Sequence, residues 1–253
     1  MYELITVKNN PATAGIKVSV AWDGTRDISA LTKVQLRRYV NDSENYTVVY
    51  ENNITTTVDL TYTYEDIDTF AGYTYRYDAC VINQYDIRWG GAEASIVCAF
   101  DGIMLADQYG SWHTAFGTSE SNYSLGAKKN RPVGYITTLS GKYPHRVSNS
   151  RANYWTGGCT ALWLPAGEVC DEPTIKDAER YRRAFIEWLM SDTEKLMKTS
   201  DGRAMIISID DGVQENWSAY AGLSTVTFEW TQIGEVNQED NYVPKMGKGW
   251  VSE

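Results

Sequence analysis

The sequence predicts a mainly β protein built from two domains. Residues 2–99 are short runs of β-branched and aromatic residues, separated by Asn, Asp, Gly and Pro. The second half contains further strand-like runs and one strong amphipathic helix pattern near residues 174–190. The chain of 253 residues is long enough for roughly one and a half to two domains with real cores.

The first domain is expected to span residues 1–99 and to contain seven short strands. We expect them at residues 4–8, 16–22, 34–40, 46–51, 55–62, 72–83 and 92–99. Within the sixth strand region, Tyr73, Tyr75 and Tyr77 are spaced by two residues and share one face. Seven short strands in under about a hundred residues indicate a β-sandwich.

Three segments of this domain resemble a fibronectin type III domain. They are the strand that ends at Trp22, the segment 34–38, and Asp66 followed by the tyrosine-rich run 72–79. The resemblance implies a two-sheet sandwich, with a tryptophan between the sheets and a tyrosine corner on the sixth strand. It also implies a spacer or adhesive module. We expect this compact module to extend outward, so that removal of residues 1–99 leaves ring formation by the second domain largely intact. The fold alone assigns no chemistry.

The second domain is expected to span residues 100–235, as a β-barrel-like (split-barrel) domain with one principal helix. We expect strands at 103–106, 133–139, 145–155, 160–164, 203–210 and 225–233, a polar loop at 110–130, and a short helix at 193–198. The principal helix at 174–190 begins at Thr174, with Asp177 in place of the usual capping-box Glu. Residues 236–253 have no periodicity and are expected to form an extended C-terminal arm.

This half carries a second resemblance. Its motifs are Asn130-Arg131-Pro132, the stretch from SGKYP to NYWTGG at 140–158, and the closing FEWTQIG at 228–234. In this order they look like tail or baseplate proteins of bacteriophages, whose split-barrel subunits assemble as rings. The resemblance implies a structural component of a tail tip or baseplate, in contact with other copies of itself and with other tail or baseplate proteins. It places the protein in the virion tail, after assembly in the bacterial host cytoplasm, and names no catalytic residue.

Composition argues against several other functions. The net charge is −10 without a long basic run, so nucleic acid would be bound against the overall field. Two histidines are too few for a three-histidine metal site. The four cysteines include no CxxC pair, so we expect reduced core thiols. No apolar stretch approaches the roughly 20 residues that cross a bilayer. We therefore expect no nucleic acid, no metal, no cofactor and no membrane insertion.

The residues do not form a recognisable catalytic constellation. The carboxylate pairs closest in sequence are Asp66 with Asp68, Asp171 with Glu172, and Asp210 with Asp211. A glycosidase needs such a pair, but each lies at an expected strand end, turn or helix start, where solvation or dipole capping explains a carboxylate. Ser111 and His113 are close in sequence, yet no serine lies in a GxSxG elbow. We expect a protein that is not an enzyme.

Aromatic residues are the main candidates for binding, because tryptophan and tyrosine are enriched at subunit interfaces and also stack on sugars. For subunit contacts, made mostly by the second domain and the C-terminal arm, we expect Trp112, Trp230, Tyr242 and Trp250. For stacking on a host surface glycan we expect Trp112 and Trp155. The alternative function is therefore a carbohydrate-binding adhesin that recognises the bacterial surface. A glycan-degrading enzyme that uses Asp210 or Asp211 is a third possibility.

Overall fold

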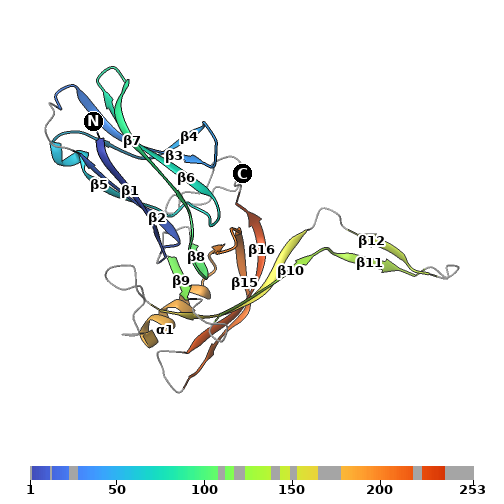
Figure 1. The fold of residues 1–253 in the computed structure, drawn as a ribbon. Helices are drawn as coiled ribbons and strands as arrows, with labels where there is room; N and C mark the ends of the chain where they lie inside the picture. The colour runs from blue at the N-terminus through green and yellow to red at the C-terminus, as the bar shows by residue number, and fades with distance from the viewer. Residues whose placement is uncertain are drawn as a thin grey trace.

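The protein is mainly β, as the sequence predicts. The structure, a computed structural model, describes residues 2–11, 13–22, 28–107, 112–116, 123–137, 143–148, 153–164, 178–218 and 224–236. Within these ranges the chain forms sixteen strands, β1–β16, together with one α-helix and one 3-10 helix (Figure 1).

Two antiparallel sheets make up the first part of the chain. One sheet has the strand order β1 (Tyr2–Asn10), β2 (Gly15–Trp22), β5 (Tyr62–Asp66). The other has the order β4 (Tyr46–Asn53), β3 (Leu31–Val40), β6 (Thr74–Asn83), β7 (Arg88–Val97). Alternate side chains such as Val18 on β2 and Leu36 on β3 are fully buried in one cluster, because every second side chain of a strand points to the same face. This is the packing that a sandwich requires.

The sandwich has the expected tyrosine corner but lacks one of the expected strands. The Tyr75 hydroxyl accepts a hydrogen bond from the Phe70 backbone N–H at 2.9 Å, which is the bond of a tyrosine corner. Trp22 is half-buried at the end of β2 and packs against the core from there. The strand expected at 55–62 is wrong. A 3-10 helix, η1 (Thr57–Leu60), occupies this segment, because the Asp59 carboxylate accepts hydrogen bonds from the backbone N–H groups just before it.

A seven-stranded sheet forms the second part. Its strands, in order, are β10 (Tyr123–Asn130), β13 (Tyr154–Trp163), β16 (Thr225–Glu235), β15 (Ala204–Asn216), β14 (Lys195–Thr199), β8 (Ile103–Asp107) and β9 (Trp112–Phe116). The end strand β9 also pairs with β13 at Leu162 and Trp163, so the sheet curls back on itself without forming a closed barrel. Helix α1 (Ala178–Leu189) packs on one face, where the Phe185 ring stacks on Trp163 at 4.3 Å.

Three expectations for the second part are corrected. The helix expected at 193–198 is the strand β14, which pairs with β8 on one side and β15 on the other. The loop expected at 110–130 contains β9 and β10. The single strand expected at 145–155 is divided, with its first half in β12 (His145–Ser148) and its last two residues in β13. The helix expected at 174–190 is found as α1, and its expected cap at Thr174 lies outside the described residues.

A two-stranded antiparallel hairpin projects from the seven-stranded sheet, as Figure 1 shows. It consists of β11 (Val133–Ile136) and β12, with Val133 opposite Ser148 and Ile136 opposite His145. In sequence the hairpin lies between β10 and β13. We call residues 131–137 and 143–148 the arm.

The two parts of the chain share a core, so the first is not a spacer that merely hangs outward. Met104, Leu196 and Val236 from the second part lie in the same buried cluster as sandwich residues. Lys198 on β14 is buried, and its ammonium group donates hydrogen bonds to the carbonyls of Ala14 at 2.7 Å and Ile67 at 2.9 Å. The expectation of an independent spacer is therefore wrong.

Candidate functional site

The arm and its supporting strands are positively charged in an otherwise acidic protein. Between Ser121 and Gly167 the sequence contains no Asp or Glu, but it contains six Lys and Arg residues. Since the whole chain has a net charge of −10, the remainder is more acidic still. The structure places this segment in β10, the arm and β13, and Arg131 and Arg146 are exposed on the arm. The fold thus places two exposed arginines on the projecting arm, while Lys128 and Lys129 on β10 belong to the seven-stranded sheet.

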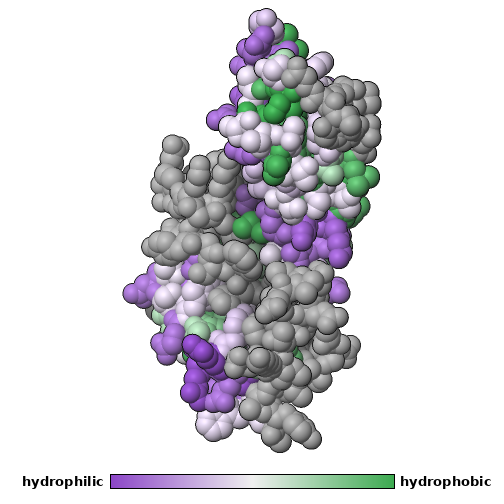
Figure 2. Space-filling view, turned by 90° about the vertical axis from the view of Figure 1, so that its left-hand side faces the viewer, coloured by the Kyte–Doolittle hydropathy of each residue, from purple (hydrophilic) through white to green (hydrophobic). Residues whose placement is uncertain are grey.

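The arm also exposes large apolar side chains. The exposed fractions are 67% for Tyr135, 56% for Ile136, 71% for Tyr143 and 51% for Val147. An isolated two-stranded hairpin is at best marginally stable in water, and exposed apolar side chains on both of its faces favour a partner. On the side away from the arm, Figure 2 shows the hydrophobic residues of the sandwich interspersed among hydrophilic ones. The arm therefore has the composition of an interface.

At the root of the arm, three glycines on β10 and β13 mark a hollow of about 580 Å³. Gly157 is required by space, because a Cβ there would collide with the Gly126 carbonyl oxygen and lie 2.8 Å from the Trp230 ring. Gly126 and Gly158 are opposite each other, and at either position the nearest atom to a Cβ is 3.9 Å away. The fold does not require glycine at these two positions. Glycine there leaves an open floor that another backbone can approach closely.

Two carboxylates stand beside this floor. Asp210 on β15 and Glu229 on β16 are direct cross-strand partners, and Glu229 is in register with Gly158. Like charges that face each other across a sheet are destabilising. The Thr231 hydroxyl donates a hydrogen bond to Asp210, and Glu229 is exposed. Lys128 lines the same hollow and supplies one positive charge. The two carboxylates therefore favour a second cationic group that comes from outside this subunit.

A second hollow, of about 330 Å³, lies beside the end of α1, where Ser208 and Ile209 of β15 line it. Ser208 lines the second hollow and pairs with Thr231, which lines the first. Its rim has exposed carboxylates from the segment after α1 and exposed apolar side chains. These residues are Asp192, Glu194, Met190 (52% exposed) and Ile233 (50% exposed). We call the two hollows together the acidic groove.

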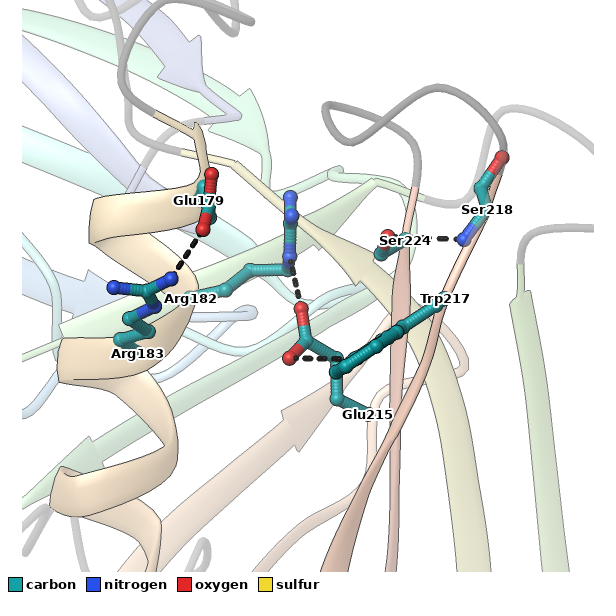
Figure 3. A pocket seen from close by; sticks show the side chains of 7 residues that line it. All are labelled: Glu179, Arg182, Arg183, Glu215, Trp217, Ser218 and Ser224. Carbon is teal, nitrogen blue, oxygen red and sulfur yellow. Dashed lines mark hydrogen bonds and ion pairs between the residues drawn. The ribbon is translucent and has the colours of Figure 1, made fainter.

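A third hollow, of about 310 Å³, lies between α1 and the far end of β15 (Figure 3). The Glu215 carboxylate accepts hydrogen bonds from Nε of Arg182 and from the indole N–H of Trp217, both at 3.1 Å. The Trp217 ring is thereby held while 85% of the residue remains exposed. An ordered, exposed indole among polar groups can stack on a sugar ring. Trp217 was not among the residues expected to stack.

The structure describes some of the expected binding residues. Trp230 is 1% exposed and lies in the core beside Phe228, so its expected role in subunit contact is wrong. Trp155 is half-buried, and the Arg203 guanidinium lies 4.8 Å from its ring centroid, where it competes with a stacking sugar. The side chain of Trp112 on β9 is outside the described residues. Tyr242 and Trp250 are also outside them.

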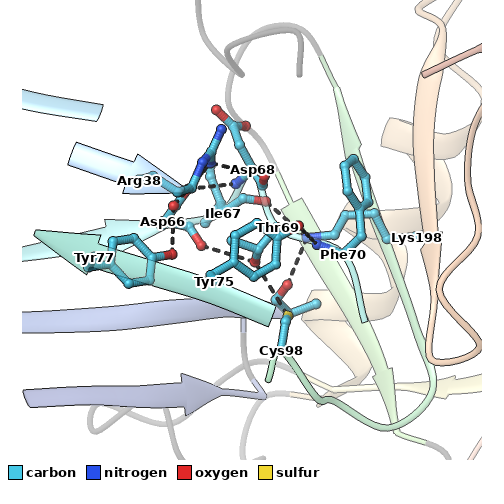
Figure 4. Close-up of polar contacts among 11 residues, drawn as sticks. Arg38, Asp66, Ile67, Asp68, Thr69, Phe70, Tyr75, Tyr77, Cys98 and Lys198 are labelled. Carbon is cyan, nitrogen blue, oxygen red and sulfur yellow. Dashed lines mark hydrogen bonds and ion pairs between the residues drawn. The ribbon is translucent and has the colours of Figure 1, made fainter. Parts of the chain in front are cut away.

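The carboxylate pairs considered for catalysis have different surroundings. Asp66 is fully buried, and it accepts hydrogen bonds from Arg38 at 2.8 Å and from the Tyr77 hydroxyl at 2.8 Å (Figure 4). Burial alone lowers the pKa of Arg38, but Asp66, Tyr77 and Asp68 together outweigh burial, and the pKa of Arg38 is raised. Asp66 is therefore committed to a buried ion pair. Asp210 is the cross-strand partner of Glu229, the side chain of Asp211 is outside the described ones, and Asp171 and Glu172 lie outside the described residues.

Cys80, Cys98 and Cys159 are free and buried, as expected for core thiols, and Cys170 lies outside the described residues. In the part of the chain that the structure describes, no group of three or more His, Cys, Asp and Glu residues is arranged to hold a metal ion. No helix among the described residues is long and apolar enough to cross a membrane. No protein-family model matches the sequence, and no curated protein matches it. The function therefore has to be inferred from the arm, the hollows and the resemblances.

The strands expected at 133–139 and 145–155 include β11 and β12, but the sequence predicts neither their pairing as a projecting arm nor the acidic groove. The signal for the arm was the absence of acidic residues over a long segment rather than a run of basic ones. The groove had no comparable signal, because Asp210 and Glu229 meet only through the pairing of β15 with β16. The register between β15 and β16 cannot be read from a single sequence.

Proposed function

We propose that this protein is a structural subunit that assembles with other copies of itself through the arm. The observation that best supports this proposal is the composition of the arm. The arm projects from the body, exposes two tyrosines and two aliphatic side chains, and lacks acidic residues. Interface energy is concentrated in a few aromatic residues, so Tyr135 and Tyr143 are the expected anchors in place of Trp230. The role is structural rather than catalytic.

The resemblance to tail and baseplate proteins supports the biological setting of this proposal. A subunit of a bacteriophage tail tip or baseplate, present in the virion tail after assembly in the host cytoplasm, needs repeated contacts between unlike surfaces. Such heterologous contacts generate closed rings when the rotation between neighbours closes, and filaments when it does not. A projecting arm that fits a different surface of a neighbour meets this requirement. Other tail or baseplate proteins are the further partners.

Sedimentation velocity over a range of protein concentrations tests the proposal. We expect the full chain to form species larger than a monomer, and the double variant Tyr135→Ser, Tyr143→Ser to sediment as a monomer. Tyr85→Ser is the matched control, because Tyr85 is 72% exposed on the turn between β6 and β7 of the sandwich. It should behave as the unchanged protein does. A full chain that stays monomeric at all concentrations would contradict the proposal.

A second candidate function, binding of a bacterial surface glycan, is favoured by the Trp217 hollow. Glu215 orients the exposed indole, and Arg183 and Ser218 supply polar groups around it. Retention on polysaccharide from bacterial cell walls should then be lost in Trp217→Ala. The control Trp89→Ala removes a 50% exposed tryptophan of β7 and should leave retention unchanged. Equal retention of all three proteins would exclude this site.

A further inference from the structure

We infer that the arm of one copy docks in the acidic groove of a second copy. This inference rests on the proposed assembly function and names the surface that receives the arm. The arm and the groove belong to the same seven-stranded sheet or its direct extension, but the arm projects away from the body (Figure 1). The occupant of the groove is therefore the arm of a neighbouring copy.

Charge complementarity is the first support. Arg131 and Arg146 are exposed on an arm that has no acidic residue. The groove presents Glu194 and Glu229 as exposed carboxylates, with Asp210 opposite Glu229 across the β15–β16 ladder. An arginine placed between Asp210 and Glu229 relieves the repulsion between them and gains charge-assisted hydrogen bonds. Lys128 also lines the first hollow, so the two carboxylates there exceed the cations of the groove, and an arginine of the arm supplies the second positive charge.

The shape and the apolar content of the groove are the second support. Its floor at Gly126 and Gly158 has no side chains, although the fold leaves room for them. Such a floor lets the backbone of an incoming hairpin approach closely. Met190 and Ile233 are half exposed on the rim, where they can cover the exposed aliphatic and aromatic side chains of the arm. The groove therefore fits a strand that is both basic and apolar.

Nucleic acid is the other occupant that a basic projection suggests. The acidic body repels a polyanion, since the whole chain has a net charge of −10. The exposed side chains Ile136 and Val147 also suit a protein surface better than a phosphate backbone. An acidic and apolar counterpart is present on the same chain. These observations favour a second copy of the chain.

Charge reversal and rescue tests the inference, with the dissociation constant measured by sedimentation velocity at low salt in nuclease-treated protein. We expect Arg131→Glu with Arg146→Glu to weaken assembly at least about tenfold, and Glu194→Lys with Glu229→Lys to do the same. A mixture of the two variants should assemble with an affinity within about threefold of the unchanged protein. The control Asp42→Lys with Glu44→Lys reverses two exposed acids on the β3–β4 turn and should change little.

Gly126→Thr provides an independent test, because a Cβ at this position meets no atom closer than 3.9 Å and the new side chain occupies the floor of the groove. It should block assembly while the thermal unfolding midpoint of the subunit stays the same. Assembly that survives both Gly126→Thr and reversal of the groove acids overturns the inference while the proposed assembly function stands. Loss of assembly without rescue in the mixture, or assembly only with added nucleic acid, also overturns it. A full chain that never assembles refutes the proposed function itself.

Discussion

Two adjacent glycines on β13 have different roles. The Cβ position of Gly157 points at the Gly126 carbonyl and the Trp230 ring, whereas that of Gly158 points into the open groove. We expect Gly157→Ala to lower the free energy of unfolding by about 1–3 kcal/mol, because an added methyl overpacks this site. Gly158→Ala should change it by no more than about 0.5 kcal/mol. Urea denaturation of both variants measures this. Equal effects would contradict the assigned orientation of the two residues.

Lys198 is the other residue with an unusual environment. Its ammonium group lies between the two parts of the chain, with two carbonyl acceptors from the described residues of the sandwich and the rings of Phe70 and Phe100 nearby. Burial lowers its pKa to about 8, and the Cys98 thiol and the carboxylates of Asp68 and Asp66 oppose that shift only in part. The folded protein therefore loses this proton at a lower pH than the unfolded chain, in which the pKa is near 10.5.

This difference gives a pH dependence with a defined sign. Between pH 8 and 10.5 the unfolded chain holds a proton that the folded protein has released, so the Lys198 contribution to stability rises with pH. The free energy of unfolding of the unchanged protein, minus that of Lys198→Met, should increase by about 2 kcal/mol from about pH 7.5 to 9.5. Because tyrosines and cysteines titrate in both proteins, the subtraction removes most of their contribution to the pH dependence. A difference that stays constant over this range would show that the ammonium is not buried.

At the scale of elements, local patterns predict some of the fold and miss the rest. The alternation of Val18 and Val20 with polar residues places β2 correctly, because the two-residue period is a property of the strand itself. The segment Lys195–Thr199 has residues that favour helices, yet it is buried between β8 and β15 as a central strand. Tertiary pairing overrides propensity here. Val226, Phe228 and Trp230 alternate with polar residues, and this two-residue period indicates that Trp230 faces the core.

The arm is an element whose loss should not affect the body. In the described sheets β11 pairs only with β12. Replacement of residues 131–150 by a short Gly-Ser linker should therefore leave the thermal unfolding midpoint of the dilute protein within about 2 °C of its original value, while assembly is lost. Differential scanning calorimetry and sedimentation velocity measure the two effects. A midpoint lowered by many degrees would mean that the arm stabilises its own subunit.

At the scale of the whole molecule, the shared core makes the two parts interdependent. Without residues 1–99, Met104 and Leu196 lose their apolar partners, and Lys198 loses both of its carbonyl acceptors. We expect a fragment of residues 100–253 to be aggregated or to unfold without a cooperative transition. Circular dichroism during heating measures this. A soluble fragment with a sharp transition would restore the idea that the sandwich is an independent spacer.

Hydrogen exchange at two protein concentrations tests the central claim, that the arm is held by a neighbouring copy, most directly. In the dilute protein, the amides of β11 and β12 should exchange rapidly, because a lone hairpin opens readily. At a concentration that supports assembly, these amides and those of the groove segments on β15 and β16 should become protected. The strands β2 and β6 of the sandwich should exchange equally at both concentrations. Arm amides that exchange at the same rate in both samples, in protein that has assembled, would contradict the account.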